Sequence, residues 1–358
     1  MKIRFLIILF LITAISSFAQ QPLYKLYLVG DAGEDELTGE TLDSLKSKLS
    51  VSPNSAVVFM GDNSYKDWFF GLMPSFKGFD SSRITQEHIQ SQLDILKNYK
   101  GSAFFVPGNH DWWNLTDFNK GRKKLQMEES FIEANLKMNK TIVNPDSTFL
   151  PRHGTPGPVS VQLNNGKVRI VFIDTFWLIL LGYKNNPPEN LILEKQFYHD
   201  LDSTLAVATA MKQTVVIVCH HPVYTTGAKI SKKLKHPYLF ARVKQSYKAF
   251  PSYADMSAKM IAILQKYPGT YFASGHLHAL QYNTVNGVHY LVSGAGSKTN
   301  HIKGKEATAP VTYNTDNMMV WNEMGFFEID IFKDHAEVIL YHEEGRRADN
   351  LTQAESAK

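Results

Sequence analysis

Short hydrophobic runs, each closed by a tight polar turn, recur along the chain. Five of them cover residues 24–29, 56–60, 103–106, 214–219 and 270–274. Uninterrupted runs of this length are typical of buried strands in an α/β sheet. Amphipathic stretches separate them and predict helices over 38–50, 83–99, 116–138, 191–209 and 253–266. The pattern therefore predicts an α/β fold.

The last third of the chain has a different pattern. Residues 279–283 and 288–293 flank Val285-Asn286-Gly287, and residues 325–331 and 336–341 flank a second polar turn. Such pairs of runs are typical of antiparallel hairpins. We expect both hairpins to extend a second sheet packed on the first, within one domain over 20–342. The polar residues 343–358 are expected to form a frayed tail.

The N-terminus predicts a targeting signal rather than a helix or strand of the fold. Lys2 and Arg4 precede an apolar run that ends near Ser17-Phe18-Ala19, which is the pattern of a secretory signal peptide over 1–19. The run is shorter than the ~20 residues that a membrane-spanning helix needs, so no stable membrane insertion is expected. The mature protein is predicted to be secreted or periplasmic.

Composition narrows the function classes only slightly. With 44% hydrophobic and 20% charged residues the chain is an ordinary globular protein, and its single cysteine excludes an internal disulfide. The 38 Lys and Arg against 34 Asp and Glu give a net charge of +4, too little to predict nucleic-acid binding by bulk electrostatics.

Metal-ligand residue types follow the ends of the predicted strands. They are Asp31, Asp62, Asn109, His220, His276 and His278. In open α/β sheets the ligand site lies outside the carboxyl ends of the strands, so we expect these side chains at one edge of one sheet. Mixed oxygen and nitrogen donors suit divalent or trivalent transition metals, and six or more donors suit two ions that share a bridging carboxylate.

The motifs around these residues resemble those of the calcineurin-like metallophosphoesterases. The matching segments are Gly30-Asp31-x-Gly33, Gly61-Asp62-Asn63-x-Tyr65, Gly108-Asn109-His110-Asp111, His220-x-Pro222-Val223 and Gly275-His276-x-His278. Within that superfamily the chain is most similar to the small, tartrate-resistant type of purple acid phosphatase, chiefly because of Tyr65. The resemblance implies a four-layer α/β/β/α sandwich with two mixed sheets.

The resemblance also implies a role for each donor. Asp31, Asp62, Tyr65 and His278 would hold a first ion, Fe(III), and Asp62 would bridge to a second, divalent ion of Fe, Zn or Mn. Asn109, His220 and His276 would complete the second site. A metal-bound hydroxide would then attack the phosphoryl group of the substrate.

Two further residues of the Gly108–Asp111 motif have candidate catalytic roles. His110 would contact the phosphate or protonate the leaving alkoxide, with Asp111 orienting it. The alternative is that His110 only fills the turn.

The chain departs from the acid phosphatases mainly at substrate contacts. Position 221 is His where they have Tyr, and Lys229 stands where the mammalian type has a further histidine. His221, His236 or Lys229 itself would supply the missing contact, unless the role is absent. Around Lys229, the segment 228–252 is longer than in those enzymes and rich in Lys and Arg, either as a solvated loop or as a basic lid that attracts anionic substrates.

Other candidates have structural explanations. Asp174 ends the sixth apolar run, 168–173, and is expected to cap a helix or support the site. Trp112 and Trp113 either stack on an aromatic leaving group or belong to the core.

These features together predict a secreted binuclear metal phosphatase, acid phosphatase-like, that hydrolyses phosphate monoesters. Its partners would be phosphorylated small molecules or phosphoproteins. Two alternatives stay open: a phosphodiesterase or nucleotide-pyrophosphate hydrolase on the same metals, and a non-catalytic phosphate-binding surface module.

Overall fold

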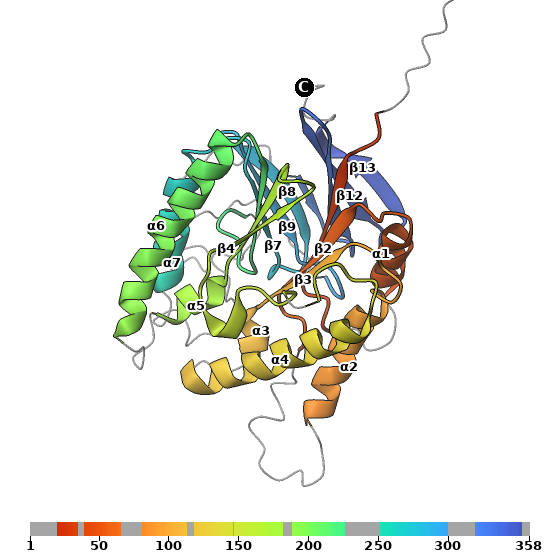
Figure 1. The fold of residues 1–358 in the computed structure, drawn as a ribbon, viewed down its shortest axis with the longest axis horizontal. Coiled ribbons are helices and arrows are strands. Elements are labelled where there is room, and N and C mark those ends of the chain that lie inside the picture. Colours follow the sequence, from red (N-terminus) through yellow and green to blue (C-terminus); the bar gives the residue numbers. More distant parts are fainter. Residues whose placement is uncertain are drawn as a thin grey trace, which may run out of the picture.

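The computed structural model describes most of the chain after the predicted signal peptide. The described residues are 20–34, 39–65, 81–112, 118–145, 147–181, 188–225, 251–299 and 319–352. The predicted signal peptide, Trp113, His236, Lys229 and nearly all of the segment 228–252 lie outside them. Figure 1 shows two sheets facing each other with helices around them.

The first sheet joins the N-terminal strands to the C-terminal ones. Its order is β13-β12-β11-β1-β2-β3. The strands are β1 (Tyr24–Val29), β2 (Ser55–Met60), β3 (Ser102–Val106), β11 (Phe326–Ile331), β12 (Ala336–His342) and β13 (Arg347–Asn350). Strands β1, β2 and β3 are parallel, whereas β11 runs antiparallel to β1 and pairs Leu26 with Ile329.

The second sheet has the order β10-β8-β9-β7-β6-β5-β4. Its strands are β4 (Val159–Leu163), β5 (Val168–Phe172), β6 (Thr214–Val218), β7 (Tyr271–Ser274), β8 (Leu280–Val285), β9 (Val288–Ser293) and β10 (Met319–Trp321). Strands β5, β6, β7 and β9 are parallel. Both sheets are therefore mixed.

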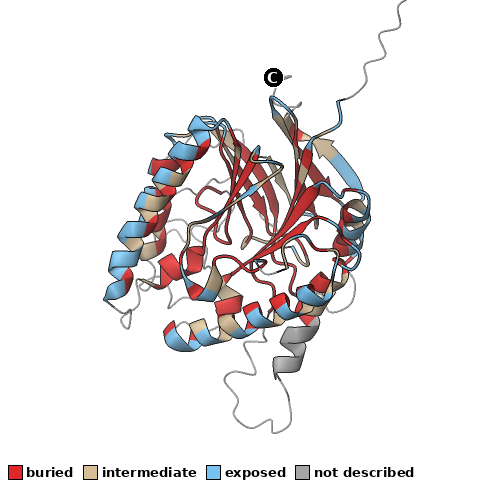
Figure 2. Ribbon diagram, in the orientation of Figure 1, coloured by how far each residue is buried: buried red, intermediate tan, exposed pale blue. Residues whose placement is uncertain are grey.

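Alternation along the strands divides the core into layers, and the central strands are almost wholly buried (Figure 2). In β1, Leu26 and Leu28 belong to a cluster between the two sheets, together with Phe104 and Phe172. Tyr27 and Val29 point the other way, into a cluster that includes residues of the helices. This arrangement confirms the predicted α/β fold with two mixed sheets.

The predicted helices are present with small shifts at their ends. They are α1 (Glu40–Ser50), α2 (Ser81–Asp94), α4 (Phe118–Met138), α6 (Glu189–Ala210) and α7 (Pro251–Leu264). Short helical segments α3 (Asn109–Trp112), α5 (Thr175–Leu180) and η2 (Arg152–Gly154) were not predicted. Among the described helices, none combines the length and the hydrophobicity that crossing a bilayer requires.

Two expectations about the last third are wrong. The hairpins do not share a sheet: β8 and β9 extend the second sheet, whereas β11 and β12 extend the first. The tail is not frayed throughout, because β13 pairs with β12 and Leu351 is buried. Local pattern identifies a hairpin, but its neighbour in the sheet depends on long-range packing.

Candidate metal centre

The predicted donors come together where the two sheets meet. Asp31, Asp62 and Asn109 follow β1, β2 and β3 of the first sheet, while His220 and His276 follow β6 and β7 of the second. The expected single sheet edge is therefore wrong. Because the sheets pack face to face, the ends of their parallel strands face each other, and each sheet supplies about half of the site.

One group of donors surrounds the Tyr65 hydroxyl. Its oxygen lies 2.7 Å from Asp31 Oδ1 and 3.2 Å from His278 Nε2, and His278 Nε2 lies 3.4 Å from Asp31 Oδ1. Tyr65 is only 9% exposed. The three residues proposed with Asp62 for the first ion thus have their donor atoms within hydrogen-bonding distance of one another.

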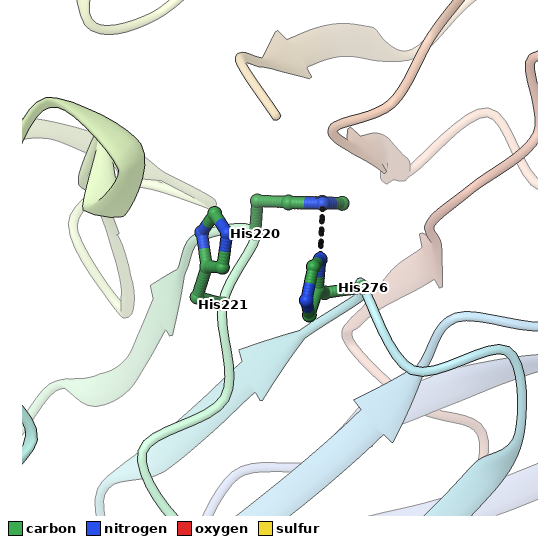
Figure 3. A group of neighbouring side chains, drawn as sticks. All are labelled: His220, His221 and His276. Carbon is green, nitrogen blue, oxygen red and sulfur yellow. Dashed lines mark hydrogen bonds between the residues drawn. The ribbon is translucent and has the colours of Figure 1, made fainter. Parts of the chain in front are cut away.

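A second group surrounds His220 Nε2. That atom lies 3.1 Å from Asn109 Oδ1, 3.2 Å from His276 Nδ1 and 3.3 Å from Asp62 Oδ1. Figure 3 shows the His220 and His276 rings meeting through these nitrogens. His220 Nδ1 faces the Met60 carbonyl at 2.9 Å, which leaves Nε2 for the site.

Both groups have the spacing of ligands around a metal ion. Two ligands about 2.1 Å from one ion, at roughly right angles, lie about 3 Å apart. Asp31, Asp62 and His220 form one candidate cluster, and His220, His221 and His276 form another. The group around Tyr65 has two oxygen donors and one nitrogen donor, and the group around His220 has two of each, so the two groups fit two transition-metal ions.

Unusual backbone geometry aims several of these side chains. Asp31, Asp62 and His276 have positive φ angles of 57°, 52° and 69°. A side chain in this left-handed conformation is re-aimed relative to a regular strand, and such residues concentrate at functional sites.

Close backbone approach also shapes the site. A Cβ at Gly108 would lie 2.4 Å from Asp62 Oδ1, and one at Gly294 would lie 2.9 Å from Asp31 Oδ2. Only glycine fits at these two positions, and this explains part of the motif at 108–111.

Charges within the site compensate one another. Burial raises the pKa of Asp62, but the opposing effect of His220 and His110 holds it well below its usual value. Burial lowers the pKa of His220, but Asp62 and Asp31 raise it to about 10. Because an imidazole binds a metal only when neutral, a bound ion would replace the His220 proton as the charge that balances Asp62.

The Tyr65 hydroxyl would lose its proton only beside a highly charged cation. Burial, together with the carboxylates of Asp31 and Asp62, raises its pKa well above the usual value. A trivalent ion at this position would supply the compensating charge that a phenolate requires.

His110 occupies the margin of the site. Its ring lies 4.6 Å from the Tyr65 ring, and its Nε2 is 3.9 Å from Asp62 Oδ2. Its backbone N–H donates to Asp62 Oδ1 at 2.8 Å. The side chain is 22% exposed, so it is open to an incoming molecule. Burial lowers the His110 pKa.

Asp111 does not orient His110 as predicted. Its carboxylate accepts hydrogen bonds from the Gly108 N–H at 2.7 Å, the Ser64 N–H at 3.2 Å and Asn63 Nδ2 at 3.1 Å. Asp111 therefore fixes the loops that carry Asp62 and Asn109, because buried backbone N–H groups need an acceptor and the Asp111 carboxylate supplies it.

His221 does not lie where a substrate contact was predicted. It is fully buried, its ring packs 4.4 Å from that of His276, and its Nδ1 is 3.0 Å from Thr175 Oγ1. Figure 3 places it beside His220. No surface of the side chain is open to a substrate in this structure.

Asp174 and Trp112 form a supporting contact. Asp174 accepts a hydrogen bond from the Trp177 N–H at the start of α5, which confirms the capping prediction. It also accepts from Trp112 Nε1 at 2.8 Å. Trp112 is fully buried against Phe118, so it belongs to the core rather than to a leaving-group platform.

Two residues close to the site were not identified from the sequence. Lys298 Nζ lies 3.3 Å from the centre of the Tyr65 ring, and the buried Glu128 on α4 is 3.4 Å from Asn63 Nδ2. Lys298 directly follows the Gly294–Ser297 turn. The only sequence signal that could have pointed to Lys298 is the position of this turn after a hairpin strand. Glu128 lies in an ordinary amphipathic helix and has none.

Comparison with known proteins agrees with this geometry. The family model described as calcineurin-like phosphoesterase matches residues 24–280. No curated protein sequence matches the chain significantly.

Two solved structures share the fold at low sequence identity. A dimetal phosphatase from Danio rerio is 11% identical, with a TM-score of 0.50 over 92% of this chain and 99% of that one. GAP50, the anchor in the inner membrane complex of Plasmodium, is 16% identical, with a TM-score of 0.57 over 91% of this chain and 88% of that one.

Proposed function

Because the chain belongs to the calcineurin-like phosphoesterase family, we propose that it is a binuclear metal phosphatase that hydrolyses phosphate monoesters. The observation that supports this proposal most is the presence of two adjoining donor groups with Asp62 at their junction. Asp62 Oδ1 lies 3.3 Å from His220 Nε2, and Asp62 is itself 2% exposed. A buried carboxylate between two donor groups is suited to bridge two ions.

The first ion is proposed to be ferric, held by Asp31, Asp62, Tyr65 and His278. The second is a divalent ion of Fe, Zn or Mn, held by Asp62, Asn109, His220 and His276. Together, when bound, such ions lower the pKa of water to supply a nucleophile and polarise the phosphoryl group. The Tyr65 hydroxyl within the first group favours the purple acid phosphatase type.

His110 is proposed to donate a proton to the leaving oxygen or to bind the phosphate. Its partly exposed ring beside Tyr65 and Asp62 places it within reach of a molecule at the site. The Asp62 carboxylate accepts a hydrogen bond from the His110 backbone N–H, which holds the turn that carries the ring. Because the two ions, when bound, would lower the pKa of the attacking water, no further protein base is required.

Export is part of the same proposal. Lys2, Arg4 and the apolar run that follows them have the pattern of a cleaved signal peptide. A secreted or periplasmic phosphatase would act on phosphorylated small molecules or phosphoproteins outside the cytoplasm.

The test is hydrolysis by protein loaded with iron and a divalent ion. We expect higher kcat/KM for p-nitrophenyl phosphate than for bis(p-nitrophenyl) phosphate or a nucleoside diphosphate. Preference for either of the latter would favour the phosphodiesterase or pyrophosphate-hydrolase alternative. No hydrolysis at full metal occupancy would favour a non-catalytic module, a role closer to that of the Plasmodium neighbour, which is described as an anchor.

A spectroscopic experiment tests the role of Tyr65. A phenolate bound to Fe(III) absorbs visible light, so the loaded protein should be violet or pink. Tyr65→Phe should lose this band and retain its fold, because the ring packing against His110 is unchanged. Colourless wild-type protein with full ferric occupancy would contradict the tyrosinate assignment.

A further inference from the structure

The loop after β9 lies against the residues that follow β1. The Gly296 N–H donates to the Gly30 carbonyl at 3.1 Å, and Ser297 Oγ donates to the Asp31 carbonyl at 2.5 Å. The Glu34 N–H in turn contacts Ser297 Oγ at 3.3 Å. This loop is therefore fixed directly beside Asp31, and it carries the next residue, Lys298, to the site.

Lys298 places a positive charge over the first donor group, which is the set formed by Tyr65, Asp31 and His278. Its Nζ lies 3.3 Å from the Tyr65 ring centre, well within the range of a cation–π contact. The Oη of that same ring contacts Asp31 and His278. The Lys298 side chain is 24% exposed, so its ammonium borders both the site and the solvent.

The Lys298 ammonium is paired with the Glu34 carboxylate, which another anion can replace. Lys298 forms an ion pair with Glu34, whose side chain is 49% exposed. Ion pairs this open to water contribute little to stability, so replacing the Glu34 carboxylate by another anion costs little. A lysine ammonium is a common point-charge ligand of phosphate.

We propose that Lys298 is a substrate-binding residue that contacts an anionic phosphate oxygen in place of Glu34 and favours dianionic monoesters over monoanionic diesters. The inference rests on the proposed phosphatase function and deepens it. A monoester carries one more negative charge than a diester, so a fixed cation beside the first donor group discriminates between the two by electrostatics. Glu34 then competes with substrate for the same ammonium.

The chain offers a matched control outside the site. Lys259 on α7 pairs with Glu194 at 2.8 Å and lies 5.1 Å from the Tyr198 ring centre. It therefore has the same kinds of partner as Lys298, with a second carboxylate, Asp255 of its own helix, at 2.6 Å. Glu194 and Tyr198 belong to α6, in the helical layer that Figure 1 shows outside the second sheet. Lys259→Met removes a comparable contact and the same charge without altering the site.

The experiment measures equilibrium binding of inorganic phosphate to metal-loaded protein by calorimetry. We expect Lys298→Met to weaken binding about tenfold, the usual size of a lost charged hydrogen bond. Glu34→Gln should strengthen it about twofold to threefold because the ammonium is released, and Lys259→Met should have no effect. Weakening by both Lys298→Met and Glu34→Gln would mean a purely structural ion pair and would overturn the proposal.

Kinetics add a second readout. With p-nitrophenyl phosphate, Lys298→Met should raise KM about tenfold and change kcat less, whereas kcat/KM for the bis-ester should fall less than about twofold. Equal losses for both esters, or loss of bound metal from Lys298→Met, would refute the assignment. Lys298→Arg should recover most of the phosphate binding. If the wild type hydrolyses neither ester, the proposed function fails, while the calorimetry still reports on Lys298.

Discussion

Asp31, Asp62 and His276 combine a functional side chain with a left-handed backbone. All three have positive φ, which non-glycine residues seldom adopt. Aspartate and histidine tolerate this conformation better than most residues, so the surroundings need to supply only part of the stabilisation at His276. The surrounding hydrogen bonds hold it there: the His276 N–H donates to Asp31 Oδ2 at 2.6 Å. At these three residues, the surrounding site therefore stabilises a left-handed backbone conformation that is rare for isolated non-glycine residues.

Substitutions at Asp62 and His110 should separate metal binding from chemistry. Asp62→Ala removes the proposed bridge, so both ions should be lost, as measured by elemental analysis. His110→Ala leaves every proposed metal donor in place and should lower kcat by about 10²- to 10⁴-fold, the usual contribution of a general acid or base. If His110→Ala emptied the site while Asp62→Ala kept its metals, the two roles would have to be exchanged.

His289 should make the fold sensitive to acid. Burial lowers its pKa to about 4, against about 6.5 in an unfolded chain. The unfolded state therefore binds the proton more readily. The stability that neutral His289 contributes is fully present above pH 6.5 and is lost as the pH falls toward 4, by roughly 3 kcal/mol at most.

Urea unfolding between pH 4 and 7 measures this loss. His289→Gln should flatten the dependence of the unfolding free energy on pH across that window. The control is His199→Gln, because the His199 side chain is 74% exposed. An unchanged slope in His289→Gln would show that other groups carry the acid sensitivity.

Among the secondary-structure elements, two helices hold the loop after β2. Gln92 on α2 donates to the Asn63 carbonyl at 2.7 Å, and Glu128 on α4 lies 3.4 Å from Asn63 Nδ2. Asn63 Nδ2 also reaches Asp111 at 3.1 Å. Burial, with the nearby Asp111 charge, raises the Glu128 pKa well above its usual value. Through these contacts the helices position the loop that carries Asp62.

Glu128 offers a test of this support. Glu128→Gln keeps a side chain of the same size with an oxygen that can accept from Asn63, and because the Glu128 pKa is raised it should leave stability and metal content near those of the wild type. Glu128→Ala leaves buried polar groups with fewer partners and should lower the unfolding free energy by about 1–3 kcal/mol. Indistinguishable denaturation curves for the two variants would show that the contact contributes nothing.

In the complete fold, the site lies across the junction of two sheets. The proposed donors of the second ion come from both: Asp62 and Asn109 follow strands of the first sheet, His220 and His276 strands of the second. The inter-sheet core brings them together, for instance through Phe104 and Phe172, whose rings are 4.8 Å apart. Bound ions would therefore cross-link the two sheets.

Metal removal should consequently lower global stability. Ligands that bind only the folded state stabilise it by about 2.7 kcal/mol at a concentration 100 times Kd. We expect a chelator to lower the Tm of the wild type in thermal unfolding followed by circular dichroism. Asp62→Ala should be insensitive to the chelator. A wild-type Tm that does not respond would mean that the ions are not bound or do not connect the sheets.

Local sequence patterns were sufficient to predict the elements and most of the candidate site. Buried strands, amphipathic helices and the Gly-Asp and Gly-His turns are local signals, since they depend on neighbouring residues and on the 2.0 and 3.6 periods. The strand-end pattern therefore selects Asp31, Asp62, Asn109, His220, His276 and His278, and the resemblance to the family motifs adds Tyr65. The fold then brings their side chains into two adjoining groups.

Tertiary packing settled how these residues are arranged and what surrounds them. Strand partners depend on contacts between distant segments, so neither the division of the donors between two sheets nor the separate sheets of the hairpins was visible locally. The same holds for side-chain partners. Asp111 binds loop backbone instead of His110, and Lys298 reaches Tyr65 from a distant part of the chain. Packing determines such contacts, because they lower the free energy only once the two sheets have met.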